Sequence, residues 1–291
     1  MEDIYKYSVI IPHKNTPELL QRCLDSIPKR SDIQTIVVDD NSNPDIVAFN
    51  RFPGKDRPYT EIFLDKTGKG AGRARNVGLE HARGRWIVFA DADDYFHPGA
   101  FETIDSKVGD DENYDMIYFC CDSRDGETGE KIADRVPHIR KGIEGDDMDL
   151  LRYRSFVPWG KVISHRLIME HNLRFEEIEA SNDVMFSTQV GFYSRQVGVI
   201  RNDLYCCTQN KTSLYFATPS KSRIMTRVKA GARVNAFMNA HGIRGYRYDT
   251  VRYTMMMMPH HPCSFLRAAW EGRYREAPVE YLRIIAYKLL K

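Results

Sequence analysis

The strongest constraint in this sequence is a short apolar run that ends in a cluster of acidic residues. Residues 86–89 read Trp-Ile-Val-Phe, which is typical of a buried strand, and Asp91, Asp93 and Asp94 follow within five positions. Carboxylates this close together repel one another and raise each other's pKa unless a cation shares their site. One interpretation is a site for Mg²⁺ or Mn²⁺ with a polyphosphate, because these cations prefer oxygen ligands. The other is an acidic first helical turn, with Asp93 or Asp94 as its N-cap.

Two earlier strands of the same kind predict that further carboxylates reach the same place. Residues 7–13 and 34–40 each read as a buried strand that ends in polar residues, and a helical pattern behind Thr16-Pro17 lies between them. Parallel strands that are apolar on both faces need helices on both sides, so the fold class is α/β. Open α/β sheets bind ligands at the carboxyl ends of their strands. We therefore expect four side chains to converge there: Asp39, Asp40, Asp91 and Asp93.

Four motifs, taken in order, resemble those of a known enzyme family. They are Ser-Val-Ile-Ile-Pro-His-Lys-Asn at 8–15, Ile-Val-Val-Asp-Asp-Asn-Ser at 36–42, Gly-Ala-Gly-Arg-Ala-Arg-Asn-Val-Gly at 70–78, and Phe-Ala-Asp-Ala-Asp-Asp at 89–94. The first hundred residues thus resemble a family 2 glycosyltransferase of the type that builds bacterial surface polysaccharides. The resemblance implies the GT-A fold, a mostly parallel central sheet flanked by helices. Accordingly we assign 1–220 to a GT-A domain, with 1–105 binding a nucleotide sugar and 106–220 holding the acceptor and base, and 221–291 to a helical, basic C-terminal extension.

The resemblance also implies roles for individual residues around a nucleotide-sugar donor. Asp40 would contact the nucleotide base or ribose, since a carboxylate accepts hydrogen bonds from both. In the Asp-x-Asp motif, Asp93 would bind Mn²⁺ or Mg²⁺, and Asp91 would hold the ribose or complete the metal's ligands. Arg75 and Asn76 follow a glycine-rich turn suited to an anion, although an ordinary loop before a helix would read similarly. The full predicted donor site comprises Pro12, His13, Asn15, Asp40, Asn41, Gly70, Arg75, Asn76, Asp91, Ala92 and Asp93.

One position departs from the family pattern. Many relatives carry an aromatic residue two positions after the proline of the first strand, where it can stack on the base. This chain has Lys14 there. A lysine can instead approach a phosphate or an acidic acceptor.

The second half supplies a candidate general base. Residues 155–166 resemble the family segment in which a Trp and a Lys, here Trp159 and Lys161, precede a strand and a helix. Residues 174–186 resemble the stretch that ends in a Glu-Asp pair before an apolar helix. The family's base corresponds to Asp183, and Asn182 replaces the usual Glu. Since Asn carries no charge, it cannot raise the pKa of its neighbour by repulsion. The alternative is that Asp183 only caps the helix that follows, and both roles are compatible.

These roles define a reaction. Asp183 would deprotonate an acceptor hydroxyl, which attacks the anomeric carbon in line with the leaving diphosphate, and the metal would neutralise the charge that develops there. A single base without a protein nucleophile implies inversion. The expected donor is a UDP-sugar, and the acceptor a glycan or a lipid-linked glycan in surface polysaccharide synthesis.

Composition is consistent with a cytoplasmic enzyme. The 291 residues are 42% hydrophobic, yet no run of about eighteen apolar residues occurs and the N-terminus lacks a signal-peptide pattern. The six cysteines include two adjacent pairs but no Cys-x-x-Cys motif, so we expect reduced, mostly buried thiols and no zinc site.

The positive charge is concentrated in the last quarter of the chain. Residues 221–291 hold fourteen Lys and Arg against four Asp and Glu, whereas the whole chain carries only +2. Residues 277–291 could form an amphipathic helix on an anionic membrane, which would make the protein peripheral at the inner face of the cell membrane. The alternative is a packed helix with solvated basic residues. No recognised nucleic-acid motif accompanies these charges, so we expect no nucleic-acid partner.

Two other functions stay open. A sugar nucleotidyltransferase also needs metal-binding carboxylates, but it requires a glycine-rich, arginine-containing loop after the first strand, where this chain has residues 12–15. A non-catalytic nucleotide-sugar-binding assembly subunit would fit the substitutions Lys14 and Asn182. We also expect a strand at 116–121, a hairpin or loop at 122–134, and a donor-closing loop that contains Lys211 and Ser213.

Overall fold

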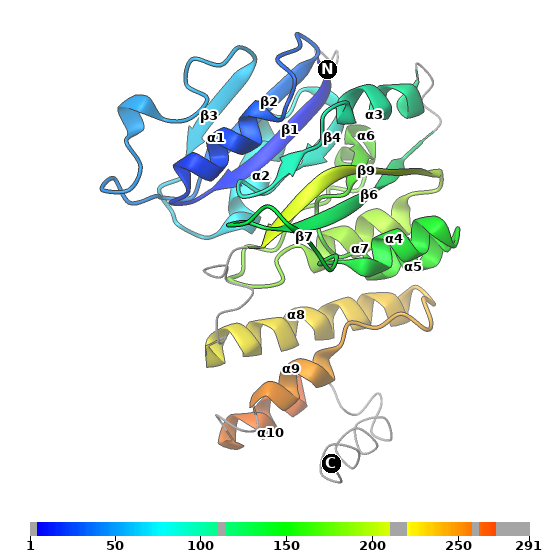
Figure 1. Ribbon diagram of the computed structural model, residues 1–291. Helices are drawn as coiled ribbons and strands as arrows, with labels where there is room; N and C mark the ends of the chain where they lie inside the picture. The colour runs from blue at the N-terminus through cyan, green and yellow to red at the C-terminus, as the bar shows by residue number, and fades with distance from the viewer. Residues whose placement is uncertain (1–4, 110–113, 210–219, 258–261, 272–291) are drawn as a thin grey trace.

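A computed structural model describes residues 5–109, 114–209, 220–257 and 262–271. These residues form one mixed sheet flanked by helices (Figure 1). The strands are β1 (Tyr5–His13), β2 (Ile33–Asp39), β3 (Thr60–Leu64), β4 (Gly84–Phe89), β5 (Tyr95–Phe96), β6 (Met116–Asp125), β7 (Lys131–Ile132), β8 (Lys161–Ser164) and β9 (Val197–Gln209). The helices are α1 (Pro17–Asp25), α2 (Ala71–His81), α3 (Ala100–Val108), α4 (Pro137–Glu144), α5 (Met148–Arg154), α6 (His165–Glu170), α7 (Val184–Tyr193), α8 (Lys221–Ala240), α9 (Thr250–Met257) and α10 (Pro262–Glu271).

The strand order explains why the polar strand ends meet. The sheet runs β3-β2-β1-β4-β8-β6-β9-β5, with β7 paired to β6. β1 lies between β2 and β4 and is parallel to both, so the ends of all three strands reach one edge. β8 is antiparallel to its neighbours β4 and β6, which leaves β1, β2, β3, β4, β6 and β9 running in one direction. The predicted α/β class, with a mostly parallel sheet flanked by helices, is therefore confirmed.

A single apolar core joins the two predicted halves of the domain. It extends from Tyr7 in β1 to Cys207 in β9 and contains the apolar residues of the central strands. β2 is buried along its whole length, as expected for a parallel strand covered on both faces. Because both parts share the same core, the predicted boundary between 1–105 and 106–220 separates two proposed functions and does not separate two folded units.

The C-terminal helices form a further layer beyond α5 and α7 (Figure 1). Val234, Met238 and Tyr248 pack against Tyr153 of α5 and Val184 of α7. The Tyr248 hydroxyl also lies 2.8 Å from the Ser181 hydroxyl, just before α7. This layer consequently contacts the segment that carries the candidate base.

Two predicted elements lie in parts of the chain that the structure does not describe. The donor-closing loop with Lys211 and Ser213 and the amphipathic segment 277–291 lie outside the described residues. Within the described ranges, no helix is both long enough and apolar enough to cross a membrane. Cys23, Cys120, Cys121, Cys206 and Cys207 are free and buried.

Candidate functional site

Hydrogen bonds join the loop after β1 to the loop after β2, at the edge of the sheet where the ligand site is predicted. His13 Nδ1 lies 2.7 Å from Asp39 Oδ2, and its Nε2 accepts a hydrogen bond from the Thr16 backbone N–H. The Ser42 hydroxyl and backbone N–H both donate to the Asp39 carboxylate. Burial opposes ionisation of Asp39, but the hydrogen bonds from His13 and Ser42 outweigh it and lower its pKa. Asp39 and His13 are buried, and their side chains hold the loops in place.

Asn15 and Asn41 shape the same two loops. Both residues have a φ of 56°, in the left-handed region that Asn tolerates. The Asn15 backbone N–H donates to the Ser42 hydroxyl, and Asn15 Oδ1 accepts from the Asn43 N–H. Asn15 therefore joins the two loops through both its backbone and its side chain.

Asp40 connects these loops to the start of α2. Its Oδ1 accepts a hydrogen bond from the Gly70 backbone N–H at 2.9 Å, and its Oδ2 lies 3.0 Å from Lys14 Nζ. Gly70 has a φ of 91°, which favours glycine, and it is the residue directly before α2. Lys14, the departure from the family pattern, thus pairs with the carboxylate expected to contact the nucleoside.

The three clustered carboxylates lie directly after β4. Candidate ligand atoms of Asp91, Asp93 and Asp94 all lie within 4.8 Å of one another. Burial and then Asp91 raise the pKa of Asp93 to about 6. Burial, followed by the charges of Asp93 and Asp91, raises the pKa of Asp94. Three oxygen ligands that repel one another are the donor set that Mg²⁺ or Mn²⁺ would stabilise, so these residues fit a divalent cation.

The interpretation of Asp93 or Asp94 as a helix cap is wrong. α3 does not begin until Ala100, and β5 lies between it and the acidic cluster. Asp94 is fully buried, and it accepts hydrogen bonds from the Tyr205 hydroxyl and the Thr208 backbone N–H, both at 2.8 Å. The Tyr205 hydroxyl in turn accepts from the Asp91 backbone N–H. Tyr205 and Thr208 are supporting residues that sequence reasoning missed.

Arg75 joins the acidic cluster to the segment before α7. Its guanidinium donates to Asp91 Oδ1 at 2.7 Å and to Asn182 Oδ1 at 3.1 Å. The helix comes this close because residue 72 is glycine: a Cβ there would lie 2.3 Å from the Glu176 carbonyl oxygen. Asn76 lies one position further along α2, and its amide exchanges two hydrogen bonds with the backbone of Phe175. The Asn76 side chain therefore fixes the two segments together.

Asp183 occupies the N-cap position of α7, but its side chain makes no capping hydrogen bond. Burial raises the pKa of Asp183, and the nearby Arg75 and Lys161 oppose that shift. Lys161 is itself fully buried, donates to the Ser155 carbonyl oxygen, and has its pKa lowered by burial to about 7. The candidate base is thus a carboxylate near two cationic groups, and one of them, Arg75, also contacts the acidic cluster.

The remaining predicted residues lie around the same edge. Pro12 belongs to β1 and is aligned with Val38 of β2, and Ala92 is a buried residue between the two aspartates. Two arginines lie near the acidic cluster: Arg22 donates to the Asp93 carbonyl oxygen, and Arg135 weakens the rise in the pKa of Asp93. Neither arginine stands in a motif, so only the fold reveals their position.

Comparisons with known proteins identify the family to which the chain belongs. The model of glycosyl transferase family 2 matches residues 8–170, more than half of the chain. A relative, the putative glycosyltransferase EpsH of Bacillus subtilis (strain 168), is 27% identical over 216 residues, which are 68% of this chain and 59% of that protein. The chain thus spans less than two thirds of EpsH.

Two solved structures share the fold. The structure of S. aureus TarS 1–349 in complex with UDP-GlcNAc has a TM-score of 0.65 at 16% identity and covers 94% of this chain and 77% of that one. The mannosyltransferase PcManGT from Pyrobaculum calidifontis, in complex with GDP-Man and Mn²⁺, has a TM-score of 0.52 at 16% identity. The match covers 98% of this chain and 80% of that one. With the family match over residues 8–170, these findings show that the chain belongs to glycosyl transferase family 2.

Proposed function

We propose that this protein transfers a sugar from a nucleotide-diphosphate donor to a hydroxyl group of a glycan or lipid-linked acceptor, with inversion at the anomeric carbon. The observation that carries the proposal is the contact of Arg75 with both Asp91 and Asn182. It brings a carboxylate of the acidic cluster next to the segment that holds Asp183. A donor-binding element and a candidate base are the two parts that an inverting transfer needs.

Asp93 and Asp91 would hold Mg²⁺ or Mn²⁺, and the cation, when bound, would neutralise charge on the leaving diphosphate. Asp40 would accept hydrogen bonds from the nucleoside, with its orientation fixed by Gly70. Asp183 would take the proton from the acceptor hydroxyl, and its raised pKa makes it a stronger base than an exposed aspartate. Support for a UDP-sugar comes from the UDP-GlcNAc in the TarS complex, and support for a metal from the Mn²⁺ in the mannosyltransferase complex.

The free, buried cysteines support a reducing compartment, which is in keeping with a cytoplasmic location. Peripheral contact of 221–291 with an anionic membrane belongs to the same proposal and rests on the excess of basic residues there.

The test measures release of nucleoside diphosphate from UDP-, GDP- and dTDP-sugars with Mn²⁺, with Mg²⁺ and with EDTA. We expect release from one donor only when a cation is present. The Asp93→Ala variant should lose it by at least about a hundredfold. The control Asp45→Asn, an exposed change of carboxylate to amide, should keep it. Release that persists in EDTA or in Asp93→Ala contradicts the proposal.

A second candidate is a non-catalytic subunit that binds a nucleotide sugar. Lys14 favours it, because its ammonium already pairs with Asp40. Metal-dependent donor binding without transfer to any acceptor would support this alternative. Transfer that is lost in Asp183→Asn, while donor binding is kept, would support catalysis.

A further inference from the structure

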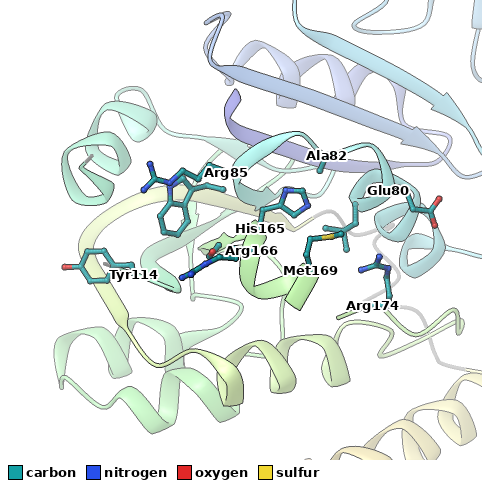
Figure 2. Close-up of a pocket in the computed structure, with 11 residues that line it drawn as sticks. Glu80, Ala82, Arg85, Tyr114, His165, Arg166, Met169 and Arg174 are labelled. Carbon is teal, nitrogen blue, oxygen red and sulfur yellow. The ribbon is translucent and has the colours of Figure 1, made fainter. Parts of the chain in front are cut away.

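Within the described ranges, side chains that can ligate a metal gather at one further place besides the acidic cluster. Ligand atoms of His97, Asp122 and Cys206 all lie within 4.8 Å of one another. A cavity of about 620 Å³ at the amino end of β4 offers no comparable group, because Glu80 and His165, which line it, lie well apart in Figure 2. The three converging side chains therefore have the arrangement of a ligand set, and the cavity does not.

The register of the sheet brings these three residues together from distant parts of the sequence. Cys206 in β9 lies opposite Asp122 in β6 on one side and opposite Tyr95 in β5 on the other, and β6 and β9 run side by side in Figure 1. The His97 backbone N–H donates to the Leu204 carbonyl oxygen, which continues the pairing beyond β5. Because side chains alternate along a strand, His97 lies on the same face as Tyr95, next to Asp122 and Cys206.

The group is distinct from the acidic cluster. Tyr205, one position before Cys206, points to the opposite face of β9, where its hydroxyl donates to Asp94. Cys206 therefore faces away from the carboxylates that are the candidate ligands for Mg²⁺ or Mn²⁺.

The spacing of the ligand atoms is close to what a tetrahedral zinc ion needs. Zn²⁺ has bonds of about 2.0–2.3 Å, which place its ligand atoms about 3.3–3.7 Å from one another. His97 Nε2 lies 2.7 Å from Asp122 Oδ1, so these two atoms would have to separate by roughly 1 Å. His97 is the partner that can move, because 21% of its side chain is exposed, against 4% of that of Asp122.

Neighbouring groups would hold the ligands in place. Arg124 Nε lies 3.4 Å from Asp122 Oδ2, so the arginine pairs with one carboxylate oxygen and the other faces His97. The Tyr95 hydroxyl contacts the Cys206 thiol. Outer partners of this kind orient the ligands of many metal sites. A thiolate and a carboxylate also carry two negative charges, which balance Zn²⁺ and leave Arg124 beside a neutral complex.

We infer that His97, Asp122 and Cys206 form a second cation site, which binds Zn²⁺ with a water molecule as the fourth ligand. Imidazole, thiolate and carboxylate together suit zinc, whereas Mg²⁺ and Mn²⁺ prefer oxygen ligands. On binding, the Cys206 thiol loses its proton to solvent, and His97 Nε2 gives up the hydrogen that it shares with Asp122. The site does not depend on the proposed transferase activity. It has no Cys-x-x-Cys motif, because the sheet register supplies the spacing.

The test is titration of the full chain with Co²⁺, a probe for zinc sites whose bond to a thiolate absorbs in the near ultraviolet. A reducing buffer with excess Mg²⁺ keeps Co²⁺ away from oxygen ligands. We expect thiolate absorption in wild type, and Zn²⁺ should abolish it by displacing Co²⁺. Cys206→Ser should lose the absorption, and His97→Ala should weaken Co²⁺ binding at least about tenfold. Cys120→Ser, at another buried cysteine outside the group, is the matched control and should bind as wild type.

Thermal unfolding in the same buffer gives a second readout. Zn²⁺ should raise the Tm of wild type and of Cys120→Ser, because a ligand of the folded state stabilises it, and should leave the Tm of Cys206→Ser unchanged. If Cys206→Ser does not fold, His97→Ala decides, since it alters a partly exposed side chain. No thiolate absorption in wild type, or equal Co²⁺ affinity in wild type and His97→Ala, would overturn the inference. Loss of the absorption in Asp93→Ala would place the ion at the acidic cluster and would also overturn it.

Discussion

The Arg75 guanidinium lies 2.7 Å from Asp91 Oδ1 and is almost completely buried. Asp91 is the more exposed partner, with a quarter of its side chain accessible. The arginine therefore neutralises part of the negative charge that three carboxylates create after β4. Its second hydrogen bond, to Asn182, extends this influence to the residue before Asp183.

Replacing Arg75 should change the pH dependence of transfer. Burial raises the pKa of Asp183, and Arg75 is the strongest influence that opposes this shift. Without the guanidinium, the pKa of Asp183 rises further, and a base must be deprotonated to act. In Arg75→Gln the acid limb of the kcat/KM profile should therefore move to higher pH. Arg73→Gln, on the same helix but paired with Asp65, Glu80 and Glu177, is the control. An unchanged acid limb in Arg75→Gln would exclude Asp183 as the base.

Removing the Asp40 carboxylate should weaken donor binding whether or not metal is present. Asp40 is buried, and it is held by Gly70 at the nucleoside end of the proposed site. We expect Asp40→Ala to weaken binding of the free nucleoside as well as of the nucleotide sugar, by about tenfold or more. Titration of uridine and UDP-sugar, with and without Mn²⁺, measures this. If only the Mn²⁺-dependent part of the affinity falls, Asp40 acts through the metal instead.

The Tyr205 hydroxyl should stabilise both the fold and the acidic cluster. It donates to Asp94 and accepts from the Asp91 N–H, so Tyr205→Phe leaves two buried groups unsatisfied. We expect a loss of about 2–3 kcal/mol in the free energy of unfolding, measured by urea denaturation. Tyr118→Phe is a matched control, because it removes one buried hydroxyl bonded to the Leu151 carbonyl oxygen, away from the cluster. Weaker Mn²⁺ binding should follow in Tyr205→Phe alone, and equal Mn²⁺ affinity in both variants would contradict this role.

Because of Lys161, the free energy of unfolding should depend on pH above about 7. Burial lowers the pKa of Lys161 to about 7 in the folded protein, from 10.5. Between these values the unfolded chain binds more protons than the folded chain, so the free energy of unfolding rises with pH from about 7 to 10.5. The full effect is on the order of 5 kcal/mol. Subtracting the pH profile of Lys161→Met from that of wild type should reveal this slope. Exposed Lys29→Met should show no such difference, and parallel profiles for Lys161→Met and wild type would contradict the prediction.

The sequence predicts the strands of the sheet well, because apolar β-branched runs such as residues 34–38 have few alternatives to burial. The position of Asp91 and Asp93 after β4 follows from the same pattern. The resemblance around Trp159 and Lys161 predicts a strand followed by a helix, and β8 and α6 lie there. The sequence does not predict that β8 pairs antiparallel between β4 and β6.

The sequence also does not predict the direction in which each side chain points. Asp39 and Asp40 are adjacent in sequence, yet Asp39 pairs with buried His13 and Asp40 with partly exposed Lys14. Asp94 and Tyr205 are 111 residues apart, and their contact exists only once β9 is in place. Motifs identify which residue types reach an edge of the sheet, and the packing around each residue decides which of them face a ligand.

The close approach at Gly72 has a consequence for recombination between relatives. A methyl group there would meet the Glu176 carbonyl oxygen, so the start of α2 fits only the particular path of the backbone around residues 176–182. A chimaera that exchanges residues 1–105 alone would combine an α2 from one parent with an unmatched partner segment from the other. Crossover points that transfer Gly72 and residues 176–183 from the same parent should give folded hybrids. The smallest exchangeable unit is therefore discontinuous in sequence.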